Sequence, residues 1–385
     1  MRVCFLFNHD QIHQIAHSLP VALALAGRPD VQVVIAATNI AIMAEIRRLA
    51  DPAQLARAEL VALDLESAFT RGMASLLDGF VPARKILIYR DNLDFFRALD
   101  MLVVTERTSL ILKRRYALHD LRMVLIDHGA GDRAIGFGAS ASGFDQLLVA
   151  GPKIRDRMVI DAGVDPARIS IVGYPKFDLA PAAPMRLPMR DNGRPTVLYN
   201  PHLSPHLSSW FGMGRRVLDY FLQSDRYNLI FAPHIMLFNR RMVTTIDRLR
   251  IAFPGGIAMK YFAADNIHID LGSHYCTDMS YVGMADLYLG DVSSQVYEFM
   301  RKRRPCIFLN AHGIDYQGDP NFSHWSAGEV IDKVDDLGPA LDRAWALHES
   351  RYAAAQDRLF DYTFDIGAEP SAARAARAIL ETASA

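Results

Sequence analysis

One segment of the chain predicts both the fold and the place of a site: Leu287-Tyr-Leu-Gly-Asp291-Val-Ser-Ser294-Gln-Val-Tyr-Glu298. An apolar run ends here in Asp-x-Ser-Ser, and a helical pattern follows. In an open α/β sheet this arrangement places polar groups at the carboxyl end of a strand, where such folds bind ligands. The start of a helix also favours phosphate, because its backbone amides and dipole attract negative charge. We therefore expect a phosphate-binding loop that includes Asp291, Ser293, Ser294, Gln295 and Glu298.

Two simpler interpretations of this segment stay open. Serine is a good N-cap residue, so Ser293 and Ser294 could serve the helix alone. Glu298, one helical turn beyond Ser294, could bind ribose hydroxyls or could be a surface glutamate.

Further polar signatures of this kind occur along the chain. They are Asp127-His-Gly129, Gly173-Tyr-Pro-Lys-Phe-Asp178, Leu198-Tyr-Asn-Pro-His202 and Phe231-Ala-Pro-His234. Because the carboxyl ends of parallel strands share one edge of a sheet, the signatures together predict a phosphate-handling cleft and not a structural protein.

Apolar runs alternate with helical stretches along the chain, which argues for parallel sheets covered on both faces. Residues 3–7 and 31–36 flank a helical pattern and form a βαβ opening. The runs that follow lie at 85–89, 101–104, 123–126, 146–149, 169–172, 196–199, 227–231, 287–289 and 305–309, and a last helix is expected near 371–382.

The length of 385 residues suits two domains better than one. Residues 179–195 carry four prolines without apolar periodicity, which predicts a linker. We expect one Rossmann-like domain over 1–178 and a second Rossmann-like domain over 196–345. Residues 346–385 should form helices that are able to pack back on the first domain.

Composition limits the classes of partner and compartment. A net charge of -1 gives no overall field for nucleic acid, so any anion site must be local. Three scattered cysteines form no disulfide framework or metal-ligand spacing, which makes a reducing cytoplasm the default. No signal peptide or membrane-spanning stretch is evident, so a membrane could be met only at its surface, for example through Lys113, Arg114 and Arg115. A solvated basic face is the plainer interpretation of that short run.

The order of the polar signatures over residues 100–330 resembles the CDP-glycerol glycerophosphotransferase family of wall teichoic acid polymerases and primases. The resemblance implies a GT-B fold, with two Rossmann-like domains and a cleft between them, and transfer of glycerol phosphate from CDP-glycerol to a membrane-bound acceptor. In such a fold the domain over 1–178 is the acceptor-side domain and the domain over 196–345 is the nucleotide-donor-binding domain. It also implies that His128 is the general base, that His234 is a ligand of the donor phosphate, and that Ser293 and Ser294 belong to the donor-binding loop.

The chain departs from the pattern of that family at three places. Ala130-Gly-Asp-Arg133 follows the His-Gly pair, Tyr199-Asn-Pro-His202 replaces a Tyr-Ala-Pro-Thr-Trp run, and Asp291-Val-Ser-Ser294 replaces Asp-Tyr-Ser-Ser. These changes touch the donor and acceptor sites, so they concern the substrate more than the fold.

Transfer of a phosphoryl group to a hydroxyl needs a proton acceptor and groups that neutralise the phosphate. A neutral imidazole at a strand end suits the first task, so we expect His128 and His234 to be catalytic; a loop histidine that binds only backbone groups is the alternative. The second task falls to a donor-binding set of Arg133, Tyr199, Asn200, His202 and His234 together with the Asp291 loop. The acceptor should meet Asn8, His9, His13 and His17, for which core or loop histidines are the alternative.

His202, His206 and His234 also raise the question of a metal. Two histidines four apart share a helical face, but Pro201 and Pro205 make a regular helix unfavourable there, and no cysteine or paired carboxylate completes a ligand set. We therefore expect no metal and no cofactor besides the activated donor.

The sequence thus predicts a transferase that moves a polyol phosphate, glycerol phosphate first, from a CDP-activated donor to a hydroxyl of a lipid-linked or glycan acceptor. The expected place is the cytoplasm or its membrane face. A nucleotide-sugar-dependent GT-B glycosyltransferase or epimerase is the enzymatic alternative, because the Asp291 segment also resembles donor loops of those families. A non-catalytic nucleotide- or lipid-binding protein is the alternative from another class.

Overall fold

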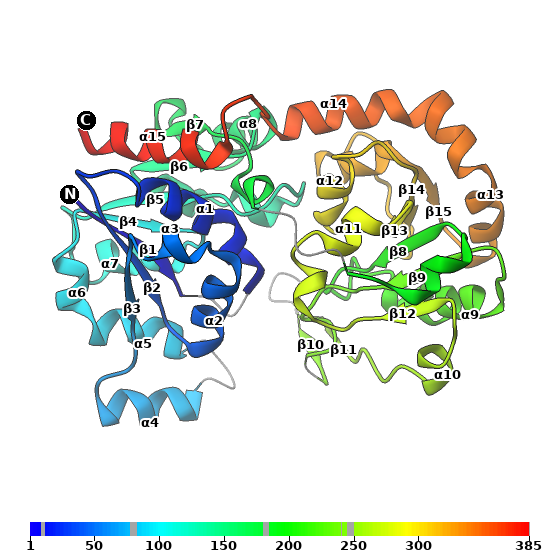
Figure 1. Cartoon of the computed structure of the whole chain (residues 1–385), viewed down its shortest axis with the longest axis horizontal. Helices are drawn as coiled ribbons and strands as arrows, with labels where there is room; N and C mark the ends of the chain where they lie inside the picture. The colour runs from blue at the N-terminus through cyan, green and yellow to red at the C-terminus, as the bar shows by residue number, and fades with distance from the viewer. Residues whose placement is uncertain (9–11, 78–82, 180–184, 240, 245–249, 385) are drawn as a thin grey trace. The chain divides into compact units, whose positions relative to one another are not determined.

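The computed structural model describes residues 1–385 except 9–11, 78–82, 180–184, 240, 245–249 and 385. The chain forms two compact units (Figure 1). The first unit comprises residues 1–128, 137–180 and 362–385, and the second comprises residues 129–136 and 181–361. The short segment 129–136 therefore belongs to the second unit, although it precedes the proline-rich segment in sequence.

The first unit is built on a seven-stranded parallel sheet in the order β3-β2-β1-β4-β5-β6-β7. Its strands are β1 (Arg2–Phe7), β2 (Gln32–Ala37), β3 (Glu59–Ala62), β4 (Met101–Val104), β5 (Arg122–Ile126), β6 (Gln146–Val149) and β7 (Ile169–Ile171). In the centre, Phe5 pairs with Ile35 on one side and with Val103 on the other. These strands are apolar on both faces because helices cover both.

Two apolar layers form the core of the first unit, one on each face of its sheet. One layer includes α1 (Ile15–Leu25), α2 (Ile40–Leu49) and the last helix, α15 (Ser371–Ser384), which packs against α1. The remaining helices of the unit are α3 (Pro52–Leu55), α4 (Ala68–Leu77), α5 (Ala83–Asp91), α6 (Leu93–Arg97), α7 (Ile111–Arg114) and α8 (Pro152–Ile160).

One expected strand was wrong. Residues 85–89 form part of helix α5, in which Ile88 and Tyr89 are buried while Arg84 and Arg90 are exposed. A short apolar run is ambiguous between helix and strand, and the tertiary packing decides it. Conversely, β3 is a strand that was not predicted. It lies at the edge of the sheet and none of its side chains is fully buried, so its sequence lacks a continuous apolar run.

The second unit repeats the architecture with a six-stranded parallel sheet in the order β12-β9-β8-β13-β14-β15. The strands are β8 (Thr196–Asn200), β9 (Asn228–Phe231), β12 (Ile267–Ile269), β13 (Leu287–Gly290), β14 (Cys306–Leu309) and β15 (Glu329–Ile331). β10 (Val243–Thr244) and β11 (Ile251–Ala252) form a separate antiparallel pair. β12 and β15 have three residues each and were not predicted.

The helices of the second unit are mostly short. They are α9 (Arg215–Gln223), α10 (Met259–Phe262), α11 (Ser280–Met284), α12 (Gln295–Phe299) and α13 (Leu337–Leu347), followed by α14 (Ala353–Thr363), whose last two residues open the final segment of the first unit. Among the described helices, none has both the length and the apolar character needed to cross a membrane.

In each sheet the direction of chain progression reverses at one place, between β1 and β4 and between β8 and β13. Open α/β sheets bind ligands outside the carboxyl ends of the strands that flank such a reversal. In the first unit these ends are followed by Asn8 and Thr105, and in the second they carry Asn200 and precede Asp291. The predicted class of two Rossmann-like α/β domains is confirmed.

Candidate functional site

His128 lies after β5 in the first unit, within a closed ring of hydrogen bonds. Its Nδ1 is 2.7 Å from the carbonyl oxygen of Thr105, and its Nε2 is 3.2 Å from the side-chain amide nitrogen of Gln14. The Thr105 hydroxyl donates to Gln14 Oε1 at 3.1 Å and closes the ring. A carbonyl can only accept, so Nδ1 carries the proton and Nε2 presents its lone pair. This is the form of imidazole that can take a proton from a hydroxyl.

The structure brings part of the predicted acceptor set close to His128. The ring of His17, on α1, lies 6.2 Å from that of His128 and is 3% exposed. Asn8 is also buried, and its amide donates to the carbonyl of Lys85 at 3.0 Å. His13 is half-buried in the turn before α1, and His9 lies outside the described residues. Contact of any of these with an acceptor remains a prediction.

A buried carboxylate that the sequence analysis missed lies directly after Thr105. Glu106 accepts hydrogen bonds from the Tyr89 hydroxyl at 2.9 Å and from the backbone amides of Thr108 and Ser109. Lys85 forms an ion pair with it at 3.2 Å. Burial, and next the charge of Glu106, raise the pKa of Tyr89 well above its ordinary value. The network fixes the loop that holds the carbonyl partner of His128.

In the second unit Arg133 lies among imidazoles. Its guanidinium donates to Nε2 of His202 at 2.9 Å, and the rings of His202 and His234 are 5.7 Å apart. Burial, and next the charge of Arg133, lower the pKa of His202 well below its ordinary value and that of His234 to about 4. Both rings are therefore neutral near pH 7, and the guanidinium supplies a positive charge. A guanidinium has five donors, so Arg133 can bind a phosphate while it donates to His202.

The buried carboxylate of Asp291 fixes the backbone of the loops in this region. The carboxylate accepts from the backbone amides of His202 at 2.9 Å, Ser209 at 2.6 Å and Val292 at 2.7 Å, and from the Ser209 hydroxyl at 2.8 Å. It is 1% exposed, and burial raises its pKa. The carboxylate thus holds the loop after β8 against the loop after β13.

The Ser293-Ser294 turn lies close to the segment that carries Arg133. Ser294 is exposed, whereas Ser293 and Glu298 are buried. A Cβ atom added to Gly131 would lie 3.2 Å from Cβ of Ser294, so the two loops approach closely where residue 131 has no side chain. The helix that follows, α12, has only five residues, and its dipole is correspondingly small.

Gln295 connects the Ser293-Ser294 turn to the loop after β12 by a hydrogen bond. Its side-chain amide donates to the carbonyl of Cys276 at 2.7 Å. Tyr199 is fully buried with its hydroxyl 2.9 Å from that of Ser209, and the amide of Asn200 donates to the carbonyl of Ala232 at 2.6 Å. These side chains form hydrogen bonds inside the second unit. A contact of any of them with the donor substrate remains a prediction.

A second buried network, also missed from the sequence, fixes the segment 129–136. Asp132 accepts from the Tyr297 hydroxyl at 2.7 Å and faces Nδ1 of His324 at 2.8 Å. Nε2 of His324 donates to the carbonyl of Asp291 at 3.0 Å, and the Trp325 indole donates to the same oxygen at 2.8 Å. Asp132 precedes Arg133 and could have been noticed for that reason, but no motif marks His324.

Two further predicted features can be placed. Lys113 forms an ion pair with Asp145 at 2.6 Å, while Arg114 and Arg115 are exposed. Contact of this run with a membrane remains a prediction. No group of three His, Cys, Asp or Glu side chains suited to a metal ion occurs among the described residues.

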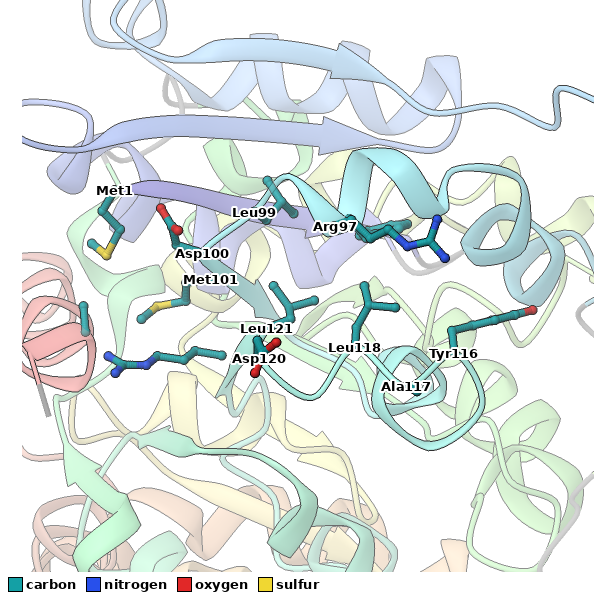
Figure 2. Close-up of a pocket in the computed structure, with 13 residues that line it drawn as sticks. Met1, Arg97, Leu99, Asp100, Met101, Tyr116, Ala117, Leu118, Asp120 and Leu121 are labelled. Atoms are coloured by element: carbon teal, nitrogen blue, oxygen red, sulfur yellow. The ribbon is translucent and has the colours of Figure 1, made fainter.

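Figure 2 shows a cavity of about 880 Å³ in the first unit, lined in part by Met1, Asp100, Met101 and Leu121. These residues precede or begin β1, β4 and β5, so the cavity lies at the amino ends of the strands. Ligands of open α/β sheets bind at the opposite ends. Asp100 already accepts from the backbone amide of Arg2 at 2.6 Å. The cavity is therefore distinct from the candidate site.

No family model matches the chain, and no curated protein sequence matches it. Solved structures do. A structure of the wall teichoic acid polymerase TagF is 13% identical with a TM-score of 0.61, over 100% of this chain and 89% of that one. A putative UDP-N-acetylglucosamine 2-epimerase from Listeria monocytogenes is 14% identical with a TM-score of 0.58, over 99% of this chain and 95% of that one. The S. aureus protein MnaA, solved with UDP, is 12% identical with a TM-score of 0.58, over 98% of this chain and 94% of that one.

At these identities the likenesses show the fold. They extend over nearly the whole length of both chains and so include both α/β units. The GT-B class predicted from the sequence is confirmed at the level of two parallel α/β domains.

Proposed function

We propose that the protein is a transferase that moves a polyol phosphate, glycerol phosphate first, from a CDP-activated donor to a hydroxyl of a lipid-linked or glycan acceptor. The observation that carries the proposal is Arg133 beside two neutral imidazoles, His202 and His234, in the second unit. The positive charge of Arg133 attracts the negative charge of a diphosphate, and the neutral imidazoles beside it add no negative charge that would repel the diphosphate.

In the proposed reaction, Nε2 of His128 takes the proton of the acceptor hydroxyl as its oxygen attacks the β-phosphorus of the donor. A new bond forms between that oxygen and phosphorus, the bond from phosphorus to the bridging oxygen breaks, and CMP leaves with the electron pair. Arg133 and His234 hold the diphosphate while negative charge shifts toward the leaving group, and His202 positions the guanidinium of Arg133 by accepting a hydrogen bond from it. The exposed hydroxyl of Ser294 supplies one more donor.

The position of His128 supports its role as base. Thr105 fixes the tautomer, and Gln14 donates to the nitrogen that must accept the proton. An acceptor hydroxyl would therefore replace the Gln14 amide on the same lone pair. Asp291 and Asp132 act as positioning residues, since their carboxylates hold the loops that carry His202 and Arg133.

A nucleotide-sugar transferase or epimerase is the second candidate. Structural neighbours described as a UDP-N-acetylglucosamine 2-epimerase and as the glycotransferase of kitacinnamycin favour it, whereas TagF, for which a structure soaked with CDPG exists, favours the first. An Arg133 site of this kind would hold the diphosphate of either donor, so the nucleobase and the transferred group decide between them.

The test combines binding and turnover. Purified protein is heated with CDP-glycerol, CDP-ribitol, CMP, UDP and UDP-sugars, because a ligand that binds the native state alone raises its melting temperature. Stabilisation by CDP-polyols and CMP, followed by release of CMP when a hydroxyl acceptor is added, supports the phosphotransferase. Stabilisation by UDP-sugars alone overturns it in favour of the second candidate, and binding without turnover with any acceptor indicates a non-catalytic binding protein.

A further inference from the structure

A second cavity, of about 1060 Å³, lies in the second unit between the turn η10 (Pro320–Ala327), β15, and the helices α13 and α14. In Figure 1 these helices follow one another at the end of that unit. None of the residues that line the cavity belongs to the predicted donor site around Arg133, His202 and His234. The cavity therefore needs a separate explanation.

One wall of the cavity is formed by a row of side chains along α13 and α14. Its residues are spaced by three or four positions and so share one face: Arg343, Leu347, Arg351, Ala355 and Arg358. The row passes through a π-helical turn, His348–Tyr352, which joins α13 to α14. Such turns are rare and are found frequently at functional sites.

The charges on this wall are not balanced. Arg343 is neutralised by Glu329, whose carboxylate oxygens lie 3.1 and 3.0 Å from its Nε. Arg351 and Arg358 are exposed and form no ion pair or hydrogen bond with any residue that the structure describes. The carboxylate of Asp319 caps η10 by accepting from the amide of Asn321 at 2.8 Å. Three arginines and two acidic residues line the cavity, so the lining carries a net charge of +1, and Arg351 and Arg358 are its two cations without an ion pair to a described residue.

The opposite side of the cavity is aromatic. Trp325 and Phe322 are buried in η10, with ring centroids 4.9 Å apart, and the half-buried Tyr316 meets Trp325 edge-on at 5.0 Å. On the helical wall, the guanidinium carbon of Arg351 lies 5.2 Å from the centroid of the Tyr352 ring. Aromatic faces pair with the C–H surfaces of polyols and sugars, and arginine is suited to phosphate.

We propose that this cavity binds a phosphate-bearing polyol or sugar chain at a distance from the reacting groups. Arg351 and Arg358 would bind successive phosphates, and Tyr316 and Tyr352 would contact the carbon backbone between them. A repeating anionic chain fits better than a single phosphate because the two free cations are separated by two helical turns. The identification of this chain with the product rests on the proposed function.

The cavity is also connected to the donor region within the second unit. Trp325 is one of the residues that line the cavity, and its indole nitrogen donates to the carbonyl of Asp291 at 2.8 Å. His324, the neighbour of Trp325, donates to the same oxygen. A ligand that shifts Trp325 would therefore act on the backbone of Asp291, two residues before Ser293, and by linkage a bound donor would then alter the affinity for the chain by the same factor.

The test is calorimetric titration of the full chain with a short poly(glycerol phosphate) oligomer. A neutral oligosaccharide of similar length and inorganic phosphate serve as comparison ligands. The double variant Arg351→Ala/Arg358→Ala is expected to bind the oligomer about tenfold more weakly, since each arginine supplies a charge-assisted hydrogen bond. The double variant Arg28→Ala/Arg47→Ala removes the same charge from exposed positions of the first unit and should bind as the parent does.

Three results would overturn the proposal: equal affinity in both double variants, equal affinity for the neutral oligosaccharide, or saturation by inorganic phosphate at the same concentration as the oligomer. Transfer to a short acceptor, measured in parallel, separates this proposal from the proposed function. If transfer occurs but the cavity variants bind normally, only the second site fails. If the oligomer binds at the cavity but no CDP-donor is turned over, only the proposed function fails.

Discussion

The carbonyl oxygen of Thr105 lies 2.7 Å from Nδ1 of His128 and fixes the proton of the ring on that nitrogen. The other nitrogen, Nε2, is left to accept, and Gln14 donates to it at 3.2 Å. The backbone of one strand end thus orients the side chain of the next, because β4 and β5 are neighbours in the sheet.

Replacing His128 should affect turnover and spare the donor. We expect His128→Gln to lower kcat at least about 100-fold, the usual contribution of a general base, with little change in donor affinity. Single-turnover rates and donor titration measure the two quantities separately. His119→Gln, at an exposed position of the same unit, is the matched control. A parallel loss of donor affinity in the His128 variant would remove the assignment of this residue as base.

Replacing Arg133 should have the opposite signature. Arg133→Met keeps the length of the side chain but removes the charge beside His202, and we expect donor binding to weaken about 10- to 100-fold, the cost of one or two charge-assisted hydrogen bonds. Titration with CMP and with the intact donor measures it, with Arg28→Met as the control. Unchanged affinity for both ligands would show that the diphosphate is bound elsewhere.

The buried network around Asp132 should stabilise the second unit. Asp132→Ala leaves the Tyr297 hydroxyl and the His324 ring without their shared acceptor, which should cost about 2–4 kcal/mol in the free energy of unfolding. All three tryptophans, Trp210, Trp325 and Trp345, belong to the second unit, so their fluorescence in urea follows this unit selectively. The cycle that combines Asp132→Asn with Tyr297→Phe should give a coupling of about 1 kcal/mol or more. Additive effects would mean that the two residues act independently.

The stability of the second unit should depend on pH through His234. Burial, and next the charge of Arg133, lower its pKa from 6.5 to about 4. Between these values the unfolded chain binds more protons than the folded one, so the stability present above pH 6.5 falls as the pH drops toward 4. This group alone accounts for up to about 3 kcal/mol of that loss, and His202 adds to it in the same direction.

Tryptophan fluorescence during urea unfolding at pH 7 and pH 5 tests this dependence. His234→Gln should reduce the difference in stability between the two pH values, whereas His119→Gln should leave it unchanged. An identical pH dependence in the parent and the His234 variant would contradict the origin of the effect in this ring.

Much of the fold could be predicted because its central strands are almost wholly apolar. Residues 101–104, 123–126 and 287–289 are strands as expected, since burial on both faces requires a continuous apolar run. The run 85–89 could not be assigned in this way, because five residues fit either periodicity and only their packing in α5 settles them. The edge strand β3 was not predicted because none of its side chains is fully buried, and the edge strand β15 was not predicted because it has only three residues.

The residues of the candidate site were likewise predicted only in part from the sequence. Strand-end motifs predicted His128, His202 and His234 as site residues from the sequence alone, since the carboxyl edge of a parallel sheet gathers such residues. Arg133 was predicted with them from the segment after the His-Gly pair, and the role of each of these residues remains a prediction. The sequence could not reveal that Tyr199 is buried, because the motif that contains it alternates between the core and the loop. Nor could it reveal the partners Gln14 and Thr105, which are 114 and 23 residues from His128 in sequence.

The amino-acid sequence by itself determined two parallel α/β sheets and the strand ends at which polar residues gather, because burial and chain direction depend on local patterns of apolar residues. Only the tertiary structure decided the protonated nitrogen of His128, the neutral state of His234 and the role of Asp291 as an internal acceptor. Each of these depends on burial and on a hydrogen-bond partner distant in sequence, and both exist only once the sheets have formed.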